Sequence, residues 1–309
     1  MFKKFFIALL TTSTLFISAC GQEETPPPVQ EPVKKFETPV ETPTQETSAT
    51  DDAEKLFAGI EEKINKHLND DTEYAVYIAY PQKSQTPYIY NSKKMRSASM
   101  IKVFILAAAL DKANKSELNI DDVITLKSSD KVGGAGILAG RPSGSEISIR
   151  ELLRLMITES DNTATNILID LLGFDYINHY IQSNGYHDTI LQRKMMDTNA
   201  INSSRENFSS VTDLGNIFTK IYQHKCVNEN FDNLMLDFLK AQADTDCFPA
   251  ALPDKIIAHK TGALAGLYDD GGIIFDDDRD TVLVIMTENF VSEHSAIQHM
   301  ISFTRSLFL

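Results

Sequence analysis

Apolar residues cover every face of one stretch in the first half of the chain. Residues 101–110 are apolar apart from Lys102, and a short loop of mostly small polar residues, 96–99, precedes them. A helix that is apolar on all sides is buried, because none of its faces suits solvent. We therefore predict a helix that runs through the interior, with Ser99 at its start.

The remaining pattern places strands near both ends of the chain and helices between them. Helical spacing marks residues 53–68, and β-branched and aromatic residues favour strands at 74–80 and 86–90. Further helices are expected at 149–158, 164–172, 175–182, 211–223 and 293–307, and further strands at 255–261, 272–275 and 281–287. Two early and three late strands are too few for two sheets, so we expect one five-stranded antiparallel sheet. The predicted fold class is α/β of the α+β type, in which the first and last helices flank the sheet and the middle helices form a second, all-helical lobe across a cleft.

The N-terminus has the pattern of a targeting segment. Lys3 and Lys4 precede an apolar run, residues 5–17, that is too short to span a bilayer comfortably. The next residues, Ile17-Ser18-Ala19-Cys20, resemble the lipobox of bacterial lipoproteins, in which the cysteine is lipidated; a plain secretory signal is the alternative. The expected divisions are a lipoprotein signal peptide at 1–19, a lipidated Cys20 that begins a disordered tether rich in Pro, Thr and Glu at 20–52, and a folded domain at 53–309. Either signal implies an extracytoplasmic protein, and a lipid would anchor it to a bacterial membrane.

Charge and cysteine content narrow the classes of partner. The chain has 29 basic and 43 acidic residues, a net charge of -14, which argues against binding to nucleic acid or to anionic lipid. Cys226 and Cys247 flank a predicted helix at 228–244, which would hold its ends roughly 20 Å apart. A disulfide needs Cα atoms within about 7 Å, so these two cysteines are not expected to pair.

Ser99 and Lys102 together suggest a nucleophile and its base. Unpaired backbone N–H groups and the positive end of the helix dipole favour negative charge at the start of a helix, where Ser99 lies. Lys102 follows three residues later on the same face, and apolar surroundings push a lysine towards its neutral, basic form. The spacing alone is not specific, because Ser128 and Lys131 repeat it in a polar stretch with no helix behind it.

Two later motifs make the interpretation much more specific. Ser160-Asp161-Asn162 lies between two predicted helices, and Lys260-Thr261-Gly262 ends a predicted strand. Alone, the first motif indicates only a helix start and the second only a strand that ends in a turn. In this order with Ser99 and Lys102, they resemble the penicillin-recognising serine enzymes, in particular the class A β-lactamases. The resemblance covers roughly residues 55–305 and implies the β-lactamase-like fold.

The resemblance also implies catalytic roles. Ser99 would attack a strained or D-configured amide carbonyl while Lys102 takes its proton. The backbone N–H groups of Ser99 and Ala263 would form the oxyanion hole. Ser160 would relay a proton to the leaving nitrogen, helped by the field of Lys260.

The remaining motif residues would bind substrate or support the site. Asn162 would hold the side-chain amide of the substrate, and Thr261 with Lys260 would face its carboxylate. Asp161 and Gly262 are expected to be structural, Asp161 by ordering its loop through backbone hydrogen bonds. The implied partner is a small β-lactam or D-alanyl peptide, bound by a monomer without cofactor or metal.

The chain departs from the family where the acyl group would be hydrolysed. Class A β-lactamases carry a run Arg-x-Glu-x-x-x-Asn, whereas this chain has Arg193-Lys194-Met195-Met196-Asp197-Thr198-Asn199. A thioether at Met195 cannot activate water, and Asp197, two residues further on, differs in reach and direction. Glu206 is expected to form an ion pair with Arg193.

A second departure follows the Lys260 motif. Many enzymes of this class place an arginine there for the substrate carboxylate, whereas this chain has Tyr268-Asp269-Asp270. Acidic residues there are expected to repel that carboxylate or to favour a different group. Together the two departures predict ready acylation and poor turnover. The alternatives are a D-alanyl-D-alanine peptidase or esterase and a non-hydrolytic sensor of penicillin or wall fragments.

The histidines add little to this interpretation. His294 and His299 are five residues apart on the last predicted helix, about 140° apart around its axis, and are not expected to share a metal. His259 is expected to be an ordinary strand residue, although its position beside Lys260 would also let it tune the site.

Overall fold

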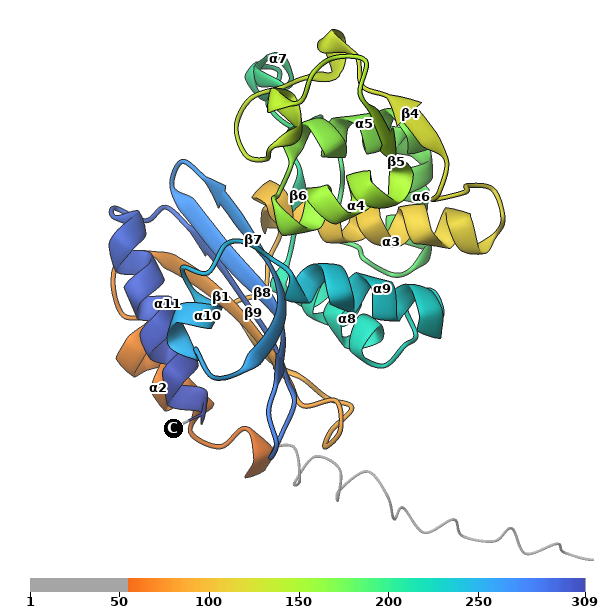
Figure 1. The fold of residues 1–309 in the computed structure, drawn as a ribbon. Helices are drawn as coiled ribbons and strands as arrows, with labels where there is room; N and C mark the ends of the chain where they lie inside the picture. The colour runs from red at the N-terminus through yellow and green to blue at the C-terminus, as the bar shows by residue number, and fades with distance from the viewer. Residues whose placement is uncertain (1–54, 309) are drawn as a thin grey trace, which may run out of the picture. The chain divides into compact units, whose positions relative to one another are not determined.

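The computed structural model describes residues 55–308 (Figure 1). The predicted signal peptide, Cys20 and tether lie outside these residues, as do the first two residues and the last residue of the predicted domain. Within the described range, no helix is both long enough and apolar enough to cross a membrane.

One antiparallel sheet joins the two ends of the described chain. Its strands, in spatial order, are β2 (Tyr88–Tyr90), β1 (Glu73–Ala79), β9 (Thr281–Glu288), β8 (Leu267–Phe275) and β7 (Ile256–Leu264). β1 pairs with β9 along its whole length, from Glu73 opposite Glu288 to Ala79 opposite Val282. The predicted sheet of two early and three late strands is confirmed, and β7 forms one of its edges.

Helices cover both faces of this sheet. On one face lie α2 (Ile60–His67), α10 (Phe248–Ala251) and α11 (Glu293–Phe308), which bury a common apolar cluster against it (Figure 1). The opposite face packs against α8 (Val211–Tyr222), which contacts β1, β8 and β9. The prediction that the first and last helices flank the sheet is therefore confirmed.

The second lobe is mainly helical. Its helices are α3 (Ile101–Asn114), α4 (Ile149–Thr158), α5 (Asn162–Leu172), α6 (Phe174–Ser183), α7 (Thr198–Asn202) and α9 (Glu229–Lys240). Short 3-10 turns at Ala98–Met100, Ser128–Asp130 and Leu138–Gly140 and two small ribbons, β3 (Met95–Arg96) with β6 (Phe208–Ser209) and β4 (Val123–Thr125) with β5 (Glu146–Ser148), complete it.

α3 runs through the interior of this lobe, as its sequence predicts. All its residues from Ile101 to Leu110 are buried, Lys102 among them. Burying one Leu or Phe side chain stabilises a fold by about 1.5–3 kcal/mol. The apolar majority of α3 therefore stabilises a helix that must also bury a lysine amine.

β7 and β8 are longer than the sequence pattern predicts. Glycine and aspartate are disfavoured in strands, so Gly262 and the pair Asp269 and Asp270 suggested breaks that the structure does not have. Glycine suits position 262, because a Cβ there would lie 3.1 Å from Met100 Cγ and 3.2 Å from Ala98 Cβ, which is closer than most Cβ contacts. The missing side chain lets the edge strand approach the turn that carries Ser99.

Cys226 and Cys247 are free thiols. They lie on either side of α9, so the prediction that they do not pair is confirmed. The helix ends at Lys240, four residues earlier than expected.

The Asp161 carboxylate holds the loop at 133–138 against the start of α5. Its Oδ2 accepts the backbone N–H groups of Ile137 and Leu138, both at 2.7 Å, and its Oδ1 accepts that of Ala164 at 2.9 Å. Gly136 approaches this carboxylate with φ +109°, and a Cβ there would lie 2.3 Å from Oδ2. One buried side chain thereby fixes both the loop and the N-terminus of the helix.

We expect Asp161→Asn to destabilise the protein by roughly 1.5–3 kcal/mol, because the amide has one acceptor oxygen where the carboxylate uses two, so at least one of the three backbone N–H groups loses a charged acceptor. The midpoint of urea unfolding measures this loss. The matched control is Asp197→Asn, which replaces the N-cap of α7 by an equally good capping residue. Equal midpoints for the two variants would contradict the structural role of Asp161.

Candidate active site

Ser99 lies in the 3-10 turn that leads into α3, on the wall of a cleft of about 320 Å³. Ala98 before it has a positive φ of 40°, a strained conformation of the kind that often marks functional sites. Ala263, near the end of β7, lines the same cleft. The Ser99 hydroxyl makes no hydrogen bond to another described residue, so it is free to meet a ligand.

The Lys102 amine is fully buried and lies at the junction of α3 and the Ser160 motif. It donates to the carbonyl oxygen of Ser160 at 2.6 Å and to Oδ1 of Asn162 at 3.0 Å, and it lies 3.0 Å from Oγ of Ser160. Sequence spacing suggested that this amine would reach Ser99, but its hydrogen bonds join it to the second motif instead. The arrangement links the first two motifs through one nitrogen.

The pKa of Lys102 is held well below its usual value, first by burial and then by the neighbouring ammonium of Lys260, while the Asp161 carboxylate opposes the shift. A neutral amine has two N–H groups and a lone pair. It can therefore keep its bonds to the Ser160 carbonyl and to Asn162 while the Ser160 hydroxyl donates to the lone pair. Such a group can act as a base near neutral pH.

Lys260 brings the third motif to the same place. It is fully buried in β7, donates to the carbonyl oxygen of Thr261 at 2.7 Å, and is close enough to Lys102 to lower its pKa. Burial lowers the pKa of Lys260 to about 8, against the opposing carboxylates of Asp244 and Asp270. At neutral pH, Lys260 is therefore mainly a cation, and it favours the neutral form of Lys102.

Asn162 and Thr261 have partners of their own. Asn162 donates from Nδ2 to the carbonyl oxygen of Gly133 at 3.2 Å and lines the cleft. Thr261 donates its hydroxyl to Oδ2 of Asp244 at 2.8 Å. The sequence reasoning did not single out Asp244, which lies in the irregular segment after α9, where no motif marks it.

Met195 lies on the wall of the cleft, 7 % exposed. Asn166 fixes its backbone, accepting from the Met195 N–H at 2.8 Å and donating to its carbonyl oxygen at 3.0 Å. Asn166 belongs to the run that begins with Ser160, but this function was not foreseen. Nε of Arg193 forms the expected ion pair with Glu206, at 2.7 Å.

The nearest carboxylate in sequence does not replace the missing glutamate. Oδ1 of Asp197 accepts the N–H of Ala200 at 2.9 Å and caps α7. Among the described residues that line the cleft, Arg193 is the one ionisable side chain, and Glu206 neutralises it. The cleft wall, as the structure describes it, therefore offers no carboxylate that could take a proton from water.

We predicted from the sequence that Asp269 and Asp270 would face the substrate carboxylate, and for these two residues the prediction is wrong. Both side chains are fully buried: Asp269 accepts the N–H of Thr287 at 2.9 Å, and Asp270 accepts the N–H of Phe248 at 3.0 Å. Nδ1 of His259 lies 2.8 Å from Asp270, so this histidine supports the sheet rather than the cleft. Alternation along β8 could not show that both side chains would be buried and that each would accept a backbone N–H group inside the protein.

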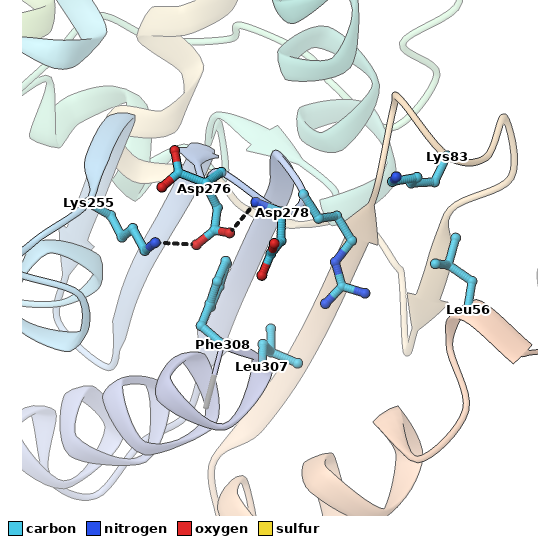
Figure 2. Close-up of a pocket in the computed structure, with 9 residues that line it drawn as sticks. Leu56, Lys83, Lys255, Asp276, Asp278, Leu307 and Phe308 are labelled. Atoms are coloured by element: carbon cyan, nitrogen blue, oxygen red, sulfur yellow. Dashed lines mark hydrogen bonds and ion pairs between the residues drawn. The ribbon is translucent and has the colours of Figure 1, made fainter.

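A larger hollow, about 660 Å³, has no catalytic groups of the kind found around Ser99 (Figure 2). It is lined by residues from the start and end of the described chain and from the turn between β8 and β9. Lys255 pairs with Asp276, whose Oδ1 accepts the N–H of Asp278 at 3.0 Å, and Arg279 lies 3.9 Å from the centroid of the Tyr80 ring. Lys255, Asp276 and Arg279 are thus engaged with neighbours, and the hollow does not contain the residues of the three motifs.

Comparison with known proteins agrees with the motifs. The model of the Beta-lactamase enzyme family matches residues 59–308. A curated relative, a β-lactamase of Streptomyces albus G, is 26 % identical over 253 residues, which are 78 % of each chain. Among solved structures, a β-lactamase of Sphaerobacter thermophilus is 26 % identical with a TM-score of 0.75, covering 82 % of this chain and 96 % of that one. A mutant of PBP-A in an acyl-enzyme complex with penicillin G shares the fold, with 24 % identity, a TM-score of 0.71 and coverage of 82 % and 96 %. On this evidence of sequence and fold, the chain belongs to the β-lactamase enzyme family.

Proposed function

We propose that this serine hydrolase opens β-lactam amides by acylating Ser99 and releases the acyl group slowly. The observation that carries the proposal is the buried Lys102 amine, which hydrogen-bonds to the Ser160 motif beside Lys260 and lies one turn of helix from Ser99. The known β-lactamases to which the chain is similar support the choice of substrate.

Acylation uses Ser99 on the cleft wall and the buried Lys102 amine, which hydrogen-bonds to the lining residue Asn162. Oγ of Ser99 attacks the lactam carbonyl carbon, and its proton passes to the neutral Lys102. The C–N bond then breaks, and Ser160 delivers a proton to the leaving nitrogen and is reprotonated from Lys102. The N–H groups of Ser99 and Ala263 donate hydrogen bonds to the oxyanion, and each donor typically lowers the activation free energy by about 2.7–4 kcal/mol.

Hydrolysis of the acyl group is the step that the chain supports poorly. A general base typically contributes about 10²–10⁴-fold to such a step. In the described cleft, the thioether of Met195 lies on the wall. Met195 stands where the run Arg-x-Glu-x-x-x-Asn of class A β-lactamases has its glutamate. The acyl-enzyme is therefore expected to persist.

The same acyl-enzyme would form with a D-alanyl peptide, which keeps the peptidase as an alternative substrate class. A non-hydrolytic sensor is favoured by Met195 alone. However, neither a base such as Lys102 nor a relay such as Ser160 serves reversible binding. Product release from β-lactams and from D-alanyl-D-alanine peptides distinguishes the three.

The N-terminal sequence supports an extracytoplasmic site of action, with the chain anchored to a bacterial membrane through Cys20. Cell-wall peptides and β-lactams both lie outside the cytoplasmic membrane, so this location fits either substrate class. Metabolic labelling with a fatty acid analogue, lost in Cys20→Ala, tests the anchor.

Incubation with a penicillin is expected to add one equivalent of its mass to the protein, because acylation outruns hydrolysis. Intact-mass spectrometry measures the adduct, and nitrocefin measures turnover. Ser99→Ala should abolish the adduct without loss of the folded state. Rapid nitrocefin hydrolysis with no lasting adduct would show that Met195 does not limit the reaction.

Met195→Glu is expected to speed loss of the adduct by about 10²-fold or more, because a carboxylate at this wall can take a proton from water. The decay of the adduct mass after removal of free penicillin gives the rate. Met195→Gln is the matched control: it has the same size and polarity but no basic oxygen of this kind. If both variants release the acyl group at one rate, the missing base is not the cause of its persistence.

The acylation rate is expected to have a bell-shaped dependence on pH. Lys102 must be neutral to accept the Ser99 proton, and its depressed pKa means that this form gains as pH rises through that value. Lys260 must remain a cation, and with a pKa of about 8 it loses its charge above that pH. Between about pH 5 and pH 10, the acylation rate should therefore first rise and then fall, and the midpoint of the fall should lie near pH 8. Circular dichroism over the same range checks that the protein stays folded. A rate that still rises at the alkaline end would remove the requirement for a charged Lys260.

A further inference from the structure

The carboxylate of Asp244 accepts hydrogen bonds from side chains of β7 and β8. Its Oδ2 accepts the hydroxyl of Thr261 at 2.8 Å, and the hydroxyl of Tyr268 lies 3.3 Å from both carboxylate oxygens. Thr261 and Tyr268 are buried, whereas Asp244 is half-buried. A carboxylate of the chain itself is therefore held where two hydroxyls converge near the surface.

These donors lie next to the Ser99 cleft. Ala263 lines the cleft, Tyr268 is its register partner, and Thr261 is the preceding residue on the same face of β7. Two residues along a strand span about 7 Å. The hydroxyl that binds Asp244 thus comes from a residue about 7 Å along β7 from Ala263, whose N–H group would receive the substrate oxyanion.

The segment that carries Asp244 is tied to both lobes. The N–H of Ala243 donates to the carbonyl oxygen of Thr158 at the end of α4, at 2.9 Å. The side chain of Gln242 donates to the carbonyl oxygen of Ile157 at 3.1 Å. On the other side, the N–H of Phe248 is bound by Asp270. These bonds hold the segment, and with it the Asp244 carboxylate, in place.

Charges of both signs lie at this end of the cleft. Lys260 is the nearby cation, and the carboxylates of Asp244 and Asp270 oppose the lowering of its pKa by burial. The Lys260 amine is itself fully buried and donates to the Thr261 carbonyl oxygen. An incoming anion would find both hydroxyls occupied and a carboxylate facing it.

We propose that Asp244 is a specificity-determining residue that slows acylation by anionic substrates at this end of the cleft and favours neutral or cationic ones. The proposal rests on the acyl-transfer function proposed above, and it names the class of substrate which that function takes. The chain supplies its own anion where a substrate carboxylate would otherwise accept hydrogen bonds. The preferred substrate therefore carries an ester, an amide or an amine at that position.

A pair of probes tests the proposal: benzylpenicillin, with a free carboxylate, and its methyl ester, which is neutral. The second-order rate of acylation is measured for each by intact mass and divided by the rate at which hydroxide opens that probe. The wild-type protein is expected to prefer the ester at least tenfold. Asp244→Asn should shift this preference at least tenfold towards the acid, because the amide removes the negative charge and keeps an oxygen for the hydroxyls.

Asp246→Asn is the matched control, since it removes an exposed carboxylate two residues further along the same segment. It should leave the preference within twofold of the wild type. A wild-type protein that prefers the acid, or an Asp244→Asn variant with an unchanged ratio, overturns the proposal and leaves the acyl-transfer function standing. If Asp244→Asn does not fold, the wild-type preference alone decides. If neither probe acylates Ser99, the proposed function fails together with the specificity that rests on it.

Discussion

The structure depends on the burial of one amine. Lys102 belongs to a helix whose other residues from 101 to 110 are apolar, and it has no exposed surface. Removing an ammonium ion from water costs several kcal/mol even after relaxation. The protein offsets this cost in two ways: it supplies oxygens of Ser160 and Asn162 as partners, and it favours the neutral form. The feature that makes the helix hard to bury is therefore the one that makes the amine a base.

This constraint explains why the site lies at the junction of two lobes. The partners of Lys102 belong to the motif that begins α5, and the second amine, Lys260, comes from the edge strand of the sheet. Bringing them together requires the sheet to approach the Ser99 turn closely, which Gly262 permits. It also requires a fixed loop beside α5, which Asp161 provides. The supports are thus as much a part of the site as the reacting groups.

Sequence pattern predicted most of this architecture, because the pattern records burial. The interior helix, the five-stranded sheet and its covering helices all follow from where apolar residues recur. Strand ends were less predictable, because Gly262, Asp269 and Asp270 are poor strand formers that tertiary contacts hold in strands. The error about Asp269 and Asp270 has the same origin, since sequence does not show that Phe248 and Thr287 supply backbone donors inside the protein. Asp244 could not be predicted at all, because its partners on β7 and β8 lie 17 and 24 residues further along the chain.

The chain has one carboxylate fewer than the resemblance implies at one end of its cleft and one more at the other. Where water would be activated, Met195 removes a base; where an anion would be bound, Asp244 adds a negative charge. Neither change breaks the hydrogen bond between Lys102 and Ser160 or removes Lys260 from beside Lys102. The groups that would acylate Ser99 are thus different from the group that would release the acyl chain and from the one that would select the substrate by its charge. A cleft altered in this way is better suited to hold a particular acyl group than to destroy many β-lactams rapidly.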